Sequence, residues 1–258
     1  MIRKVSYAIT AALTVAAIAA ELLHAPVLLL FALTSLALVG LAWLLGEATE
    51  SVGHHAGPRV SGVLNATFGN AAELIITIFA LSAGLTGVVK ASIIGSVIGN
   101  VLLVLGASIL LGGLKNGTQR FSTTIAGANA AMLAIIVFAL AFPTVFATLD
   151  PAEGGAWSTE YLSLSVAAVL LVLYILYLLF YLRRQGQPGG EERPPFGKMA
   201  SFALLLGTTA AVAYVSEAFV GAIEPLVSEI GVSELFIGVI LVPIIGNIAE
   251  HVVGVQIA

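Results

Sequence analysis

Residues 61–83 read SGVLNATFGNAAELIITIFALSA, an apolar stretch in which Glu73 is the only charged side chain. A helix needs about 20 apolar residues to cross the hydrocarbon core of a bilayer, so this stretch has the length of a membrane span. Residues 235–258 read LFIGVILVPIIGNIAEHVVGVQIA and again carry a single charged residue, Glu250. Both stretches contain Gly-Asn-x-x-Glu, which predicts a membrane protein with a repeated intramembrane carboxylate.

The composition of the whole chain supports this prediction. Hydrophobic residues make up 59% of the sequence and charged residues 9%, whereas soluble domains carry about 25% charged residues. There is too little charge to cover a surface that faces water. Because backbone groups in lipid must be hydrogen-bonded within their own segment, we expect an all-α membrane protein, a polytopic bundle of about eight transmembrane helices.

Eight apolar stretches define the predicted spans. They cover residues 5–23, 27–46, 61–83, 91–113, 122–147, 161–182, 199–221 and 235–258. The longest polar stretch, 183–198, contains Gly, Pro and Gln, and its composition is typical of a flexible linker. It divides the chain into 1–182 and 199–258.

The Lys and Arg residues predict the orientation, since they favour the cytoplasmic side. With the N-terminus in the cytoplasm, nine of the ten Lys and Arg residues lie inside and Lys90 alone lies outside. The nine are Arg3, Lys4, Arg59, Lys115, Arg120, Arg183, Arg184, Arg193 and Lys198. One missed or invented span would destroy this asymmetry.

The two carboxylates predict a cation site. Charged residues inside membrane spans are rare and mostly functional. Four predicted spans lie between the two motif helices, so these helices run in opposite directions, as in the inverted repeats of secondary transporters. Glu73 and Glu250, with Asn70 and Asn247 three residues before them, offer the oxygen ligands that Ca²⁺ prefers. The chain contains no Cys, which excludes thiolate metal sites.

Neighbouring polar residues extend the predicted site. Ser92, Ser96 and Asn100 follow one face of the 91–113 helix, where they either complete the cavity or form ordinary interhelical hydrogen bonds. Thr67 and Thr77 continue the helical face of Asn70 and Glu73. His251 is about 100° around the helix from Glu250, so it either joins the site or faces another neighbour. The predicted metal-binding set is therefore Glu73, Glu250, Asn70, Asn247, Ser96, Asn100 and His251.

Three stretches resemble the calcium/proton exchangers of the calcium/cation antiporter superfamily. They are Leu64–Ile75, Gly95–Asn100 and Gly246–His251. The resemblance implies an extra N-terminal helix (1–24), a first five-helix repeat (25–182), a cytoplasmic linker (183–198) and the start of a second, inverted repeat (199–258). It also implies that Glu73 and Glu250 are the central cation-binding carboxylates.

The expected function is exchange of calcium ions for protons at one shared site. Two empty carboxylates carry a charge that is costly to bury, and one Ca²⁺ or two protons neutralise it, so only loaded forms can switch between the two sides. Alternatives are a sodium-coupled cation exchanger, a passive cation channel and an intramembrane enzyme. The sequence offers neither a nucleophile–base pair nor a metal cluster, so we expect no enzyme and no prosthetic group.

The expected partners are calcium ions, protons and the lipid bilayer, and the expected location is the plasma membrane of a prokaryote. The family pattern continues for three more helices, whereas this chain stops eight residues after Glu250. We therefore expect either a partial sequence or a second chain that completes the second repeat.

Overall fold

The structure is a computed structural model that describes residues 2–118, 120–149, 155–184, 196–248 and 251. Within these ranges every regular element is a helix. Six helical stretches are long and apolar enough to cross a membrane, and two shorter apolar helical stretches cover Ala71–Ser82 and Glu234–Gly246. This confirms the predicted all-α bundle of about eight spans.

The chain forms two compact units, which are residues 1–117 with 188–258, and residues 118–187. The first unit contains α1 (Ile2–Leu22), α2 (Val27–Ala56), α3 (Pro58–Phe68), α4 (Ala71–Ser82), α5 (Thr86–Ile98), the π-helical segment η1 (Gly99–Val104) and α6 (Leu105–Asn116). It continues with α9 (Lys198–Gly221), α10 (Ile223–Ile230), α11 (Glu234–Phe236), the π-helical segment η2 (Ile237–Leu241) and α12 (Val242–Gly246). The second unit contains α7 (Thr123–Leu149) and α8 (Gly155–Arg184).

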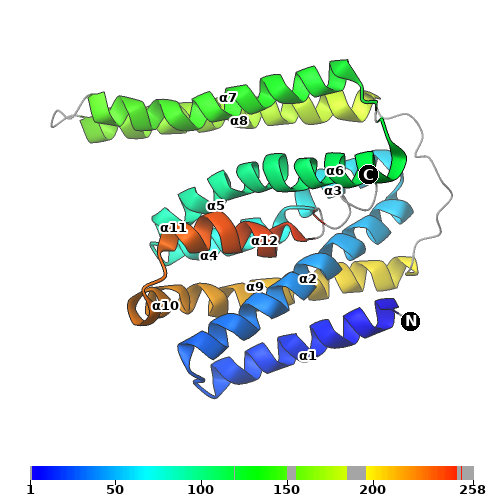
Figure 1. The fold of residues 1–258 in the computed structure, drawn as a ribbon, viewed down its shortest axis with the longest axis vertical. Helices are drawn as coiled ribbons and strands as arrows, with labels where there is room; N and C mark the ends of the chain where they lie inside the picture. Colours follow the sequence, from blue (N-terminus) through cyan, green and yellow to red (C-terminus); the bar gives the residue numbers. More distant parts are fainter. Residues whose placement is uncertain (1, 119, 150–154, 185–195, 249–250, 252–258) are drawn as a thin grey trace. The chain divides into compact units, whose positions relative to one another are not determined.

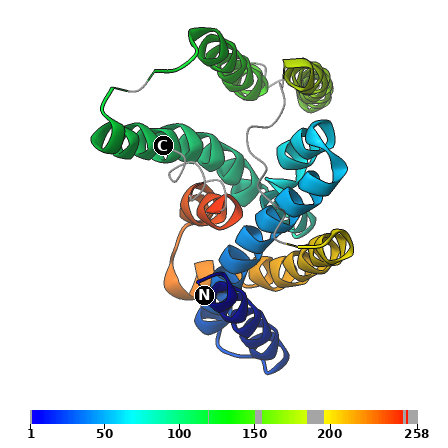
Figure 2. The same ribbon diagram turned by 90° about the vertical axis from the view of Figure 1, so that its right-hand side faces the viewer.

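Helix α2 is the centre of the first unit. It packs along α9 on one side and α1 on another, as Figures 1 and 2 show. Phe31 of α2 stacks on Phe219 of α9 with ring centroids 5.0 Å apart, and Leu38 and Leu45 are fully buried. Because lipid is as apolar as these side chains, close packing and not transfer out of water holds such helices together.

The two motif regions pack onto this framework from both ends of the sequence. Helix α4, which carries Glu73, contacts α9, and α12, which precedes Asn247, contacts α2, α4 and α5. Segment η2 packs against α5. The fold therefore brings the motifs at Glu73 and Asn247 together although they are far apart in the sequence.

Three predicted spans differ from the observed helices. The span predicted at 235–258 leaves helical geometry at Asn247, with φ −107° and ψ 15°. The span predicted at 61–83 is two helices, α3 and α4, because the backbone leaves helical geometry at Asn70, with φ −99° and ψ 12°. The span predicted at 27–46 continues to Ala56. The predicted span ended at residue 46 because polar residues follow from Glu47 onward. The helix continues beyond it because its hydrogen bonds are formed within its own backbone and do not require apolar side chains.

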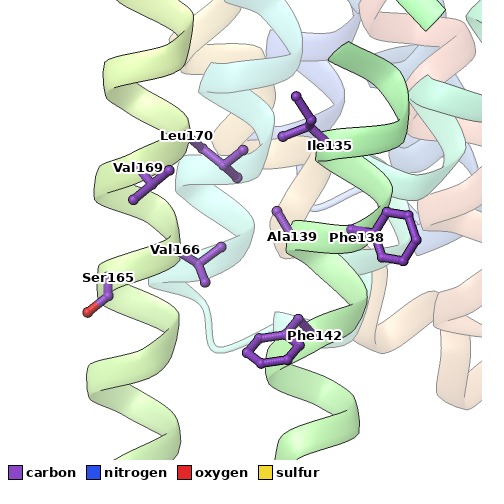
Figure 3. Close-up of a pocket in the computed structure, with 8 residues that line it drawn as sticks. All are labelled: Ile135, Phe138, Ala139, Phe142, Ser165, Val166, Val169 and Leu170. Carbon is purple, nitrogen blue, oxygen red and sulfur yellow. The ribbon is translucent and has the colours of Figure 1, made fainter. Parts of the chain in front are cut away.

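The second unit is a pair of packed helices. Tyr177 of α8 donates a hydrogen bond to Asn129 Oδ1 of α7 at 3.2 Å. A shallow groove between the helices is lined by apolar side chains and Ser165, as Figure 3 shows. It contains no ionisable group among its lining residues, so it is suited to acyl chains or apolar helices and not to a cation.

The Phe31–Phe219 contact leads to a stability prediction. Phe219→Ala should lower the free energy of unfolding by about 2 kcal/mol, from about 24 cal/mol per Å³ of cavity over roughly 100 Å³ of lost side chain. Thermal unfolding in detergent measures this loss. The control is Phe202→Ala on the same helix, where the ring is 41% exposed and its loss should have little effect. Equal losses for the two variants would contradict the central role of the α2–α9 contact.

Candidate cation site around Glu73

Glu73 lies in the first turn of α4, directly after a break in the helix. The buried residues Ala71, Ala72, Ile76 and Ala80 hold α4 in the helix bundle, and the Glu73 side chain is half-buried. The break at Gly69–Asn70 separates α4 from α3, so Glu73 occupies the N-terminal end of a helix. A helix N-terminus carries a partial positive charge.

The same backbone break occurs at the second motif. Asn247 follows Gly246 with φ −107° and ψ 15°, within a few degrees of the Asn70 values. Both residues lie near the sparsely populated bridge region, which is common at functional sites. The two Gly-Asn pairs therefore share a local structure as well as a sequence.

Three side chains donate hydrogen bonds to the Glu73 carboxylate. Ser92 and Ser96 of α5 both donate to Oε1, Ser92 at 3.0 Å. Asn247 Nδ2 donates to Oε2 at 3.3 Å and contacts Ser96 Oγ at 3.3 Å. The contacts join α4, α5 and the residue after α12 in one polar cluster, which we call the Glu73 cluster (Glu73, Ser92, Ser96 and Asn247).

One acceptor of the Glu73 cluster is unused. Asn247 is 1% exposed, and its Oδ1 atom has no hydrogen-bond partner among the residues described. A buried amide oxygen without a partner is costly. Asn247 Oδ1 is thus a buried acceptor on a side chain whose amide nitrogen is bonded to the Glu73 carboxylate.

Glycines allow the two motifs to approach each other. A Cβ placed on Gly246 would lie 2.8 Å from Glu73 Cβ, and one placed on Gly95 would lie 2.7 Å from Pro243 Cγ. The Cβ on Gly95 would also collide with the Val239 backbone. Any side chain at these positions would push the backbone of one motif away from the other.

Comparison with known proteins identifies the family. A model of the sodium/calcium exchanger protein family matches residues 26–183 and 200–258. The chain belongs to this family. The chain is similar to the Ca(2+)/H(+) antiporter ChaA of Bacillus subtilis, which is 40% identical over 243 residues, covering 90% of this chain and 68% of that protein.

Other relatives agree with this assignment. The Ca(2+)/H(+) antiporter of Aphanothece halophytica is 39% identical over 257 residues, with 92% of this chain and 68% of that protein covered. A solved structure, "Structure of native YfkE", matches with a TM-score of 0.81 at 37% identity, covering 97% of this chain and 73% of that chain. These matches confirm the predicted resemblance to calcium/proton exchangers and establish a multi-pass membrane protein.

The structure of this exchanger-family chain brings together some of the predicted site residues. Glu73, Ser96 and Asn247 are in direct contact. Ser92 belongs to the same cluster; its spacing of four from Ser96 marked it in the sequence, but the predicted metal-binding set omits it. Gly246, which precedes Asn247 in the second motif, provides the close backbone approach to Glu73.

Other predicted residues lie differently. Asn70 is exposed at the helix break, Asn100 is half-buried in η1 and His251 is half-buried. Thr67 and Thr77 donate to the backbone oxygens of Val63 and Glu73, and the helix break at Asn70 places Thr67 in α3 and Thr77 in α4. Glu250 lies outside the described residues.

The close approach at Gly95 leads to a matched pair of variants. Gly95→Ala should destabilise the protein by about 1–3 kcal/mol, since the added methyl group meets backbone on η2. A Cβ on Gly99, one turn along, meets no described atom within 4 Å, so Gly99→Ala should change stability by about 0.5 kcal/mol or less. Melting temperature in detergent reports both. A stable Gly95→Ala protein would contradict the described contact between α5 and η2.

Proposed function

We propose that this chain exchanges calcium ions for protons across a membrane by alternating access at a site shared by Glu73 and Glu250. The observation that carries the proposal is the Glu73 cluster, in which a carboxylate is held between the two motifs beside an unused Asn247 oxygen. The names of the relatives support calcium and protons as the exchanged ions.

The donor set suits a hard cation. Calcium takes about six to eight oxygens from carboxylates, amides, hydroxyls, backbone and water. Glu73 and Asn247 Oδ1 offer such oxygens, and the hydroxyls of Ser92 and Ser96 can accept as well as donate. Within the described residues no group of three or more His, Asp or Glu could hold a metal, so the proposal assigns the second carboxylate to Glu250. Asn70, Asn100 and His251 are assigned supporting positions.

Charge balance couples the two ions in this proposal. Two carboxylates in a membrane carry two negative charges, which are costly to bury during a conformational change. One Ca²⁺ or two protons remove that cost, so each loaded form can switch and the empty form cannot. Calcium and protons then compete for the same oxygens, and no separate proton site is needed.

Alternating access is proposed from the symmetry of the motifs. The matched backbone angles at Asn70 and Asn247 support two related repeats, and the two stretches that match the family model, 26–183 and 200–258, support a boundary near 183–198. The proposed division is an extra helix (1–24), a first repeat (25–182) and the start of an inverted repeat (199–258). In transporters with inverted repeats, the site lies at the midplane between the halves.

The test of function is calcium uptake into proteoliposomes driven by a pH gradient. Glu73→Gln should reduce uptake by about 100-fold or more, since even a residue that only supports a metal ligand contributes about 10- to 100-fold in affinity. Glu224→Gln, on the exposed face of α10, is the control and should transport normally. Normal uptake by Glu73→Gln would refute the proposal, and uptake driven by sodium without a pH gradient would favour the sodium-coupled alternative.

The proposed orientation has the N-terminus in the cytoplasm of a prokaryote and Lys90 on the outer side of its plasma membrane. Because the chain contains no Cys, single cysteines report topology directly. Lys90→Cys should react with an impermeant thiol reagent from outside, and Arg120→Cys should react only from inside. Labelling of both from one side would contradict the inverted arrangement of the repeats.

A further inference from the structure

The Glu47 carboxylate lies in the C-terminal half of α2, next to Arg3 in the first turn of α1. We propose that α1 is a clamp that holds the C-terminal end of α2 against the N-terminal end of α9, with the ion pair between Arg3 and Glu47 as its releasable contact. The inference does not depend on which ions the protein carries.

Tyr7 is the apolar part of the clamp. Its ring lies 5.7 Å from the Trp43 ring of α2 and 6.0 Å from the Phe196 ring, two residues before α9. The Tyr7 side chain of α1 therefore contacts both α2 and the residues that lead into α9. One turn further along α1, Thr10 is buried against Gly40 of α2. A Cβ atom added to Gly40 would lie only 2.5 Å from the Thr10 hydroxyl oxygen.

The Arg3–Glu47 pair is the polar part, and its two members differ in exposure. Arg3 Nε lies 3.4 Å from Glu47 Oε1; the Arg3 side chain is 68% exposed and the Glu47 side chain 9% exposed. Both Glu47 oxygens are buried without a hydrogen-bond partner among the described residues, and the Tyr7 hydroxyl is the other polar group of α1 near them.

This geometry makes the contact releasable. A single approach at 3.4 Å lacks the two short hydrogen bonds of a forked Arg–carboxylate pair. Arg3 can exchange its partner for water, whereas Glu47 cannot. A buried carboxylate that loses its cation is destabilised. We therefore expect the position of α2 to depend on whether Arg3 is paired with Glu47 or with water.

The clamped ends of α2 and α9 are joined by direct polar contacts. Ser51 Oγ and Ser201 Oγ, both on fully buried residues, are 2.7 Å apart, and His55 Nε2 lies 2.8 Å from the Phe196 carbonyl oxygen. Water reaches the Ser51–Ser201 bond only when the helix ends separate. That bond is therefore a local reporter of the clamp.

Separation of these ends would also affect the Glu73 cluster. Helix α2 contacts α12, which precedes Asn247, and α9 contacts α4, which carries Glu73. The two clamped helices thus pack against the elements that carry the cluster. Loosening the clamp is expected to loosen the packing of these elements.

The test uses Ser201→Cys as a single reporter in the full-length chain in detergent. The rate of reaction with a small water-soluble maleimide measures how often the ends separate. Adding Arg3→Gln should raise this rate by about tenfold, because it leaves Glu47 buried without its cation. The matched control is Lys4→Gln, which removes the same charge from the neighbouring residue, exposed and without an ion pair among the described residues; it should leave the rate unchanged.

If the Arg3→Gln protein does not fold, Glu47→Gln tests the same ion pair. This variant removes the ion pair without leaving a buried charge, so it should fold and still raise the rate above that of Ser201→Cys alone. Adding Arg3→Gln to Glu47→Gln should then have no further effect, since Arg3 acts through Glu47. Equal rates in Glu47→Gln and its parent, or a further increase in the double variant, would overturn the proposal.

Discussion

A carboxylate inside an apolar helix bundle must be satisfied by its neighbours, because lipid offers neither water nor counterions. Glu73 meets this requirement with three donors from two other parts of the chain, Ser92, Ser96 and Asn247. The packing of α4, α5 and α12 serves this arrangement. If the helices moved apart, the carboxylate would lose its donors before the bundle lost its apolar contacts.

The small residues in the motifs follow from the same requirement. Hydrogen bonds of about 3 Å between side chains as short as Ser and Asn require backbones that nearly touch. Gly246 next to Glu73 and Gly95 next to Val239 provide that approach. The helix breaks at Asn70 and Asn247 add the N-terminal end of α4 and free the Asn247 side chain to face the carboxylate. Apolar packing alone would not select this pattern of glycine, asparagine and serine.

The carboxylates of Glu73 and Glu47 have different environments. Glu73 is surrounded by neutral donors, which can rearrange around a cation or a proton. Glu47 faces an exposed arginine and a tyrosine from α1 and has no close hydrogen bond among the described residues. Neutral donors suit a site that changes its occupant, whereas a charged partner from another helix suits a contact between helices. The difference explains why we assign ion binding to one and clamping to the other.

The sequence by itself determined the membrane fold and the approximate spans and singled out Glu73, because an isolated charge among apolar residues and a repeated Gly-Asn-x-x-Glu motif are local patterns. It could not determine that Ser92 and Ser96 donate to the Glu73 carboxylate, whereas Thr67 and Thr77 donate to backbone oxygens of their own helices. That selection depends on the packing of α4 against α5. Nor could it reveal the contact of Arg3 with Glu47, 44 positions apart. Hydrogen bonds and ion pairs between helices depend on how the helices pack, and only the tertiary structure fixes that packing.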